Sequence, residues 1–250
     1  MSRYKGGCQI TPRDIELFHY LFANKVALKT QIMRDVFRKS HPTVSLRLQK
    51  LVHHHWLDRT AISGFGNMRY TYSISTKTLG EYIQSEWYDL TESKRKSDAP
   101  AHDIVLIDIR NKLKSLSNVT QIISENMLQR KPSNSSSDSY GAFRRLNSDN
   151  ALKLSFPNED EYLLPLEYEA STKSSSRCRD KVMQYYTMTD FPAILYIVEK
   201  TSTQKQLVLC EQDLVQNARP KLFFAQANDV LHHEGKVTFT NFKGDTLALI

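Results

Sequence analysis

The chain has 250 residues, of which 40% are hydrophobic and 24% are charged, so it can form one large globular domain or two small ones. No apolar run is long enough to span a membrane and the first residues lack a signal-peptide pattern, so we expect no membrane partner. Three widely spaced cysteines argue against a disulfide framework and predict a protein of the reducing cytoplasm.

The positive charge is concentrated in the first part of the chain. Residues 1–100 hold 16 lysines and arginines against 9 aspartates and glutamates, whereas residues 101–250 hold 18 of each. The whole net charge of +7 therefore belongs to the first part. General solubility would not place charge so unevenly, and a basic region of this kind favours nucleic acid as a partner.

Residues 1–90 have the pattern of three short helices followed by a β-hairpin. Thr11 caps a first helix, residues 28–37 indicate a second, and a third follows Pro42. Two β-rich segments within residues 56–74 are joined by a Gly/Asn turn, which predicts a hairpin. This order is typical of a winged helix-turn-helix, whose third helix enters the major groove while the wing contacts the DNA backbone.

The predicted third helix has an apolar inner side and a polar outer side. The outer side and the wing supply the predicted DNA contacts, which are Thr43, Arg47, Gln49, Lys50, Asn67 and Arg69. A winged helix used for protein contacts is the alternative. Residues 91–100 are polar and charged, and we expect them to be a linker.

Residues 101–250 predict a second domain of the α/β class. We expect a helix at 102–116, strands at 119–123, 151–156 and 162–169, a helix at 177–188 and a strand at 193–198. Further on, we expect a helix at 211–219 and strands at 221–225, 237–242 and 246–250. A fully apolar strand after a helix implies a mixed sheet covered on both faces.

Residues 130–148 indicate a long irregular segment between two of these strands. Loops of this length are usually functional or disordered. Arg144 and Arg145 within it are candidate phosphate contacts. For the Ser-rich part of the segment, a solvated loop is the alternative.

The predicted strand at 162–169 ends in Glu167-Tyr168-Glu169. Residues two apart share one side of a sheet, so the two carboxylates should lie together. Like charges repel and resist burial unless a cation lies between them, and a hard divalent cation suits this role. The alternative is a solvated edge strand with two exposed acids.

The order of elements, with Asp149 at the start of one strand and Glu167-Tyr168-Glu169 at the end of the next, resembles the PD-(D/E)XK nuclease superfamily. The segments 101–104, 124–126, 166–169 and 179–186 are more narrowly similar to the replication-relaxation proteins of mobile elements, which also carry an N-terminal winged helix. Those proteins include the MOBC-type plasmid relaxases. The resemblance extends over nearly the whole chain up to about Val198.

The resemblance implies a metal-dependent endonuclease that nicks one strand at the origin of transfer of a plasmid. Asp149 and Glu167 would hold Mg²⁺ or Mn²⁺, with Glu125 as a further candidate ligand, and the metal would polarise the scissile phosphate. Double-stranded DNA at that origin is the implied partner, and an accessory mobilisation or coupling protein is a further candidate. The sequence leaves the oligomeric state open.

The chain departs from the superfamily at Glu169, because a lysine usually stands there. Lys181 on the following helix, or Lys173 in the loop, is the candidate for the missing positive charge. The catalytic set implied by the resemblance is therefore Asp149, Glu167, Glu169 and Lys181. Tyr185 and Tyr186 are expected to be core and groove residues, although the sequence leaves a covalent tyrosine mechanism open.

Two other functions stay open at this point. The chain could be a non-catalytic DNA-binding regulator of replication or transcription in a mobile element. It could also be a restriction- or transposon-type endonuclease that cuts both strands.

Overall fold

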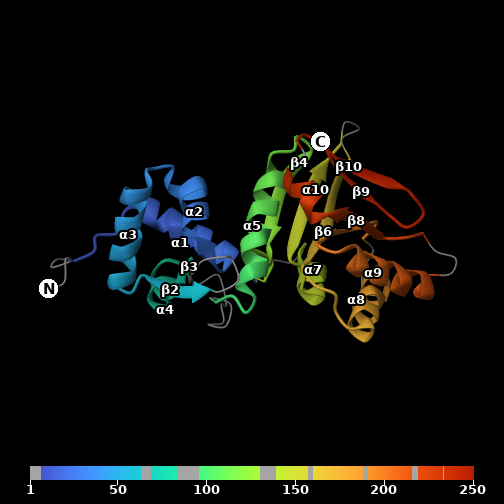
Figure 1. Ribbon diagram of the computed structural model, residues 1–250, viewed down its shortest axis with the longest axis horizontal. Coiled ribbons are helices and arrows are strands. Elements are labelled where there is room, and N and C mark those ends of the chain that lie inside the picture. Colours follow the sequence, from blue (N-terminus) through green and yellow to red (C-terminus); the bar gives the residue numbers. More distant parts are fainter. Residues whose placement is uncertain are drawn as a thin grey trace. The chain divides into compact units, whose positions relative to one another are not determined.

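The computed structural model describes residues 7–62, 69–83, 96–129, 139–156, 160–187, 191–215, 219–232 and 234–250. The chain divides into two compact units (Figure 1). The first unit comprises Met1–Ile107 with Arg130–Ser135, and the second comprises Asp108–Gln129 with Ser136–Ile250. The division falls inside one helix, α5 (Pro100–Lys114), just after the predicted linker at 91–100, of which residues 91–95 lie outside the described part.

The first unit combines helical segments with a small antiparallel sheet. Its elements in chain order are α1 (Pro12–Asn24), β1 (Ala27–Leu28), α2 (Lys29–Ile32), η1 (Met33–Phe37), α3 (His41–His53), β2 (Leu57–Ile62), β3 (Arg69–Ile74), α4 (Thr76–Thr78) and η2 (Leu79–Ile83). The sheet has the strand order β1-β3-β2. The three predicted helices and the paired strands of the hairpin are confirmed, although the second helix ends as the π-helix η1. The predicted wing turn lies within residues 63–68, outside the described part.

Local sequence explains where α1 begins and how α3 packs. Thr11 and Asp14 form a capping box, in which the Asp14 carboxylate accepts the Thr11 backbone N–H at 2.7 Å. On α3, Val44, Leu48 and Leu51 recur at helical spacing and are fully buried in the core of the first unit. The opposite side of α3 is consequently left outside that core.

The second unit is built around a larger sheet. After α5, its elements are β4 (Val119–Ser124), α6 (Glu125–Leu128), α7 (Gly141–Leu146), β5 (Asn150–Ser155), β6 (Glu161–Glu169), α8 (Ser175–Thr187), β7 (Ile194–Val198), α9 (Thr201–Leu214), β8 (Leu222–Gln226), α10 (Ala227–His232), β9 (Val237–Thr240) and β10 (Thr246–Leu249).

The seven strands of this sheet lie in the order β10-β9-β8-β7-β6-β5-β4. The β6-β7 and β7-β8 pairs are parallel, and the other pairs are antiparallel. The predicted mixed α/β sheet is therefore confirmed. The backbone N–H and C=O of Ile250 bond to Asn118, so the sheet curls until the ends of its two edge strands meet.

Strand register separates the two faces of the sheet. Tyr196 and Phe224 pack with Tyr185 of α8 and Leu207 of α9 in one core, so these two helices cover one face (Figure 1). On the other face, Asn150 lies opposite Leu166 and accepts a hydrogen bond from Arg110 of α5 at 2.9 Å. Side chains of β6 therefore alternate between the α8 and α9 side and the α5 side.

Two sequence predictions need correction in the second unit. The segment 130–148 is not wholly irregular, because Gly141–Leu146 forms α7. The helix predicted at 211–219 is instead α9, Thr201–Leu214, whose polar first turn hides its start. The short helix α10 was not expected from the sequence. None of the helices in the described residues combines the length and the apolar character that a membrane crossing requires.

Candidate active site

Strand β6 lies in the middle of the large sheet and carries both acids of the predicted site. It pairs with β5 on one side and β7 on the other, and Glu167 lies opposite Tyr196 in the parallel pair with β7. Glu167 and Glu169 are both buried, with 4% and 9% of their surface exposed. The solvated edge strand considered from the sequence is therefore wrong, because β6 is central and its acids are covered.

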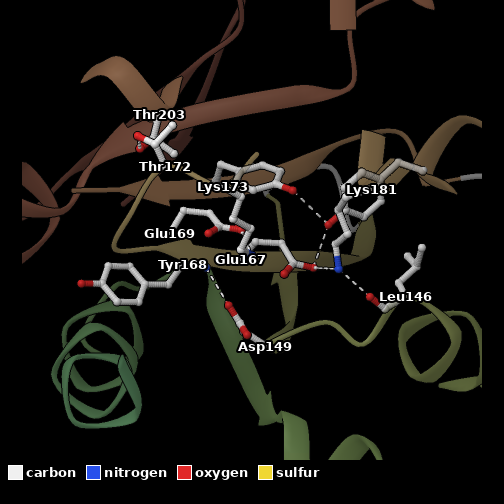
Figure 2. A network of polar contacts seen from close by, with 11 residues as sticks. Leu146, Asp149, Glu167, Tyr168, Glu169, Thr172, Lys173, Lys181 and Thr203 are labelled. Carbon is white, nitrogen blue, oxygen red and sulfur yellow. Dashed lines mark hydrogen bonds and ion pairs between the residues drawn. The ribbon is translucent and has the colours of Figure 1, made fainter. Parts of the chain in front are cut away.

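Asp149 reaches the same place from the neighbouring strand. It immediately precedes β5, whose Asn150 pairs with Leu166, so continuing this register sets Asp149 opposite Glu167. The Asp149 carboxylate accepts the backbone N–H of Tyr168 at 2.8 Å, as Figure 2 shows. The sequence prediction that Asp149 and Glu167 come together is consistent with this arrangement.

Helix α8 brings a cation to the same carboxylate. The Lys181 ammonium nitrogen lies 3.4 Å from Glu167 Oε1 and donates to the backbone carbonyl of Leu146 at 2.5 Å (Figure 2). The Tyr185 hydroxyl, one turn further along α8, donates to the same Glu167 oxygen at 2.9 Å. Lys181 and Tyr185 share one face of the helix because they are four residues apart.

The pKa of Glu167 is raised to about 7, chiefly because burial disfavours the charged carboxylate. The Lys181 charge and the Tyr185 hydrogen bond act in the opposite direction, while the Asp149 and Glu169 carboxylates raise the pKa further. A strongly raised pKa in a buried acid beside a specific cation is a feature of functional sites.

Glu169 has its own partner. Its Oε1 accepts from the Lys173 ammonium at 2.5 Å, so the two lysines proposed from the sequence serve different acids (Figure 2). Lys181 is paired with Glu167, whereas Lys173 is paired with Glu169.

The donor set of Asp149 and Glu167 suits a hard divalent cation. Both supply carboxylate oxygens, and their mutual repulsion raises the pKa of Glu167, so a cation between them would relieve an electrostatic cost. Glu125 begins α6, and its backbone N–H donates to the Asp149 carbonyl at 2.9 Å. No cluster of three or more His, Cys, Asp or Glu side chains of metal-binding arrangement occurs in the described residues.

The remaining basic candidates of the second unit lie on α7. Arg144 donates to the backbone carbonyl of Leu128 at 2.9 Å, which joins α7 to α6. Arg145 is exposed. Leu146, the last residue of α7, is the one whose carbonyl receives Lys181.

In the first unit, most of the predicted DNA contacts lie outside the core. Thr43, Gln49 and Arg69 are exposed, and Lys50 is half-buried. Arg47 instead forms an ion pair with Asp14, whose side chain is fully buried. Asn67 lies outside the described residues.

Sequence reasoning did not assign a role to Tyr196 or to the Leu146 carbonyl at this site. The four-residue spacing of Lys181 and Tyr185 was a usable signal for the helix face that meets Glu167. No sequence pattern marks a backbone carbonyl as a partner.

In comparisons with known proteins, no family model, curated protein or solved structure matches this chain.

Proposed function

We propose that the protein is a metal-dependent DNA endonuclease in which the first unit binds duplex DNA and the second hydrolyses a phosphodiester. The observation that carries the proposal is the meeting of Asp149, which directly precedes β5, with Glu167 of β6 and Lys181 of α8. In line with the family resemblance, the proposed reaction is nicking of one strand at the origin of transfer of a plasmid.

The residues of the second unit have separate tasks in this proposal. Asp149 and Glu167 would hold Mg²⁺ or Mn²⁺, which would supply Lewis-acid polarisation of the phosphate and lower the pKa of a water. Lys181 keeps positive charge at Glu167 and so favours the charged carboxylate that a metal requires. Above a pH of about 7, Glu167 is charged even without the metal.

The proposed DNA reader is a winged helix-turn-helix. Three helical segments followed by the β2-β3 pair have its order of elements, and α3 would be the helix in the major groove. Thr43 and Gln49 are exposed on α3, and the excess positive charge of the chain lies in residues 1–100. These features support binding to a polyanion.

The first prediction concerns supercoiled plasmid that carries the cognate origin, incubated with Mg²⁺ or Mn²⁺. Wild-type protein should yield a nicked circle, and Asp149→Asn or Glu167→Gln should each lower the nicking rate at least about 100-fold. Glu161→Gln is the matched control, because Glu161 begins the same strand but is exposed. It should nick at the wild-type rate.

Two outcomes of this assay would contradict the proposal. Equal rates for Asp149→Asn, Glu167→Gln and wild type would place the chemistry elsewhere. A linear product instead of a nicked circle would indicate cleavage of both strands.

A second candidate is a non-catalytic DNA-binding regulator. The contacts of Glu167 with Lys181 and Tyr185, and of Glu169 with Lys173, favour it, because each acid already has a partner within the protein. Melting in the presence of Mn²⁺ separates the two functions. A metal that binds the folded state raises the melting temperature, whereas a regulator without a metal site would melt at an unchanged temperature.

A further inference from the structure

Two buried tyrosine hydroxyls form a chain that ends on Glu167. Tyr196 donates to the Tyr185 hydroxyl at 3.2 Å, and Tyr185 donates to Glu167 Oε1 at 2.9 Å. Both tyrosines are fully buried, and their rings meet edge to face with centroids 6.3 Å apart. Each hydroxyl thus donates to the next polar group, and hydrophobic side chains of the core around α8 surround the pair.

The chain is anchored by secondary structure at each step. Tyr196 lies on β7 directly beside Glu167 in the parallel register, and Tyr185 lies on α8 above that face of the sheet. Burial raises the pKa of both tyrosines well above 10, so their hydroxyls keep their protons and act as donors. A rigid donor of this kind restricts the carboxylate to few orientations.

The contacts to Glu167 are unevenly divided between its two oxygens. The Tyr185 hydrogen bond and the Lys181 ion pair both end on Oε1, and neither uses Oε2. Metal-binding carboxylates are commonly held by such outer hydrogen bonds, which orient the ligand and tune its affinity.

We propose that Tyr185, supported by Tyr196, is a positioning residue that holds Glu167 by Oε1 and leaves Oε2 to the metal ion. The inference rests on the proposed metal-dependent function. It assigns the two tyrosines a task in metal binding beyond filling the core, and it places them one step away from the reacting phosphate.

Adjacent tyrosines on α8 provide a matched comparison. Tyr186 also carries a hydrogen-bonded hydroxyl, but it donates to Glu211 at 2.6 Å instead of Glu167. Tyr185→Phe and Tyr186→Phe therefore remove the same atom from neighbouring positions, and each keeps its ring. Only the first change removes a donor from Glu167.

The experiment is an Mn²⁺ titration of each full-length variant by calorimetry at one pH, with nicking assayed at limiting and saturating Mn²⁺. Tyr185→Phe should weaken Mn²⁺ binding about 10- to 100-fold, Tyr196→Phe should weaken it less, and Tyr186→Phe should leave it unchanged. Saturating Mn²⁺ should restore most of the nicking rate of Tyr185→Phe, since the ligands themselves are intact. A purely structural role would lower the melting temperature of the metal-free protein without this split between metal affinity and turnover.

The failures can be told apart. If Glu167→Gln loses Mn²⁺ while Tyr185→Phe binds it as wild type does, the positioning role is wrong and the proposed function stands. If the wild-type protein binds no Mn²⁺, both are wrong. If Tyr185→Phe does not fold, Tyr196→Phe decides, and wild-type Mn²⁺ affinity in that variant overturns the positioning role.

Discussion

Each unit of this protein buries a carboxylate beside a long basic side chain, yet the pKa values of the two carboxylates shift in opposite directions. Asp14 of the first unit is fully buried, and burial alone would raise its pKa, but hydrogen bonds from Arg47 and Thr11 bring the pKa below its ordinary value. Glu167 of the second unit is buried beside Lys181, and its pKa rises to about 7. The presence of a cation therefore does not by itself determine the direction in which the pKa of a buried carboxylate shifts.

The difference lies in the number of donors and in the neighbouring charges. Asp14 accepts from two nitrogens of Arg47 and from the backbone and hydroxyl of Thr11, so both of its oxygens are used. Among the described residues, one ammonium at 3.4 Å and one hydroxyl contact Glu167, and two further carboxylates lie near it. A fork of guanidinium donors matches a carboxylate better than a single ammonium does.

The two ion pairs consequently point to different roles. The Asp14 pair joins the start of α1 to α3 with its hydrogen bonds complete, as expected of a structural ion pair. Glu167 retains an electrostatic cost that a bound cation would relieve. Natural proteins keep such costs mainly at functional sites.

The largest expected effect tests the structural pair. Arg47→Met keeps an apolar stem but leaves the fully buried Asp14 without its cation, so the free energy of unfolding should fall by about 3–5 kcal/mol. Urea denaturation followed by tryptophan fluorescence measures it, because Trp56 lies in the core of the first unit. The double variant Asp14→Leu/Arg47→Met should recover most of the loss, since it removes both charges.

An unchanged urea midpoint in Arg47→Met would show that the Asp14–Arg47 ion pair does not stabilise the first unit, so the two units would no longer differ in this respect. Arg47 would then again be a candidate for the DNA contact predicted from the sequence. The measurement therefore decides whether Arg47 has the structural role that its ion pair implies.

The next effect is the pH dependence of stability that Glu167 causes. Lys181, Tyr185, Asp149 and Glu169 are the neighbours that act on its pKa. The folded protein keeps the proton up to a pH of about 7, whereas the unfolded chain releases it near 4.5. Between these values the folded state binds more protons, so raising the pH favours unfolding. In metal-free protein, Glu167→Gln should remove this dependence and be more stable than wild type by about 3 kcal/mol above pH 7.

Urea midpoints of both proteins across this pH range, with a chelator present, check the prediction. The two curves should converge toward pH 4.5 and separate as the pH rises. Parallel curves would show that folding does not shift the pKa of Glu167 and would remove the electrostatic argument for a metal. Asp14 should act in the opposite sense, because its lowered pKa makes stability fall as the solution becomes acidic.

Much of the fold could be predicted because its signals are local. The Thr11 cap, the spacing of Val44, Leu48 and Leu51, and the apolar run of β7 each correspond to an element that the structure contains. Helix α9 was misplaced because its first turn, Thr201-Ser202-Thr203, consists of residues that usually favour caps and strands. Tertiary packing of Leu207 and Cys210 against β7 and β8 overrides that preference.

The candidate site was predictable only in part, because only the relations between residues of the same strand or helix leave a local pattern in the sequence. Alternation along one strand relates Glu167 to Glu169, and spacing along one helix relates Lys181 to Tyr185. Strand register, which no local pattern specifies, brings Asp149 and Tyr196 to Glu167. Burial likewise depends on the whole fold, so the raised pKa of Glu167 could not be derived from its neighbours in sequence.

The smallest expected effect tests whether the two basic residues of α3 differ as the ion pair implies. Arg47 is committed to Asp14, whereas Lys50, three residues further along, belongs to the half-exposed side of the helix. Lys50→Ala should therefore weaken binding to the cognate DNA by about 1 kcal/mol without changing the urea midpoint. Fluorescence anisotropy with cognate and unrelated duplexes measures the difference.

Arg69→Ala is the matched change on β3, where the side chain is exposed. It should weaken cognate and unrelated duplexes alike and reduce the slope of log affinity against log salt by about 1, as expected for one lost phosphate contact. Wild-type binding by both Lys50→Ala and Arg69→Ala would remove the reader role from the first unit. The affinity for DNA would then come from residues other than Lys50 and Arg69.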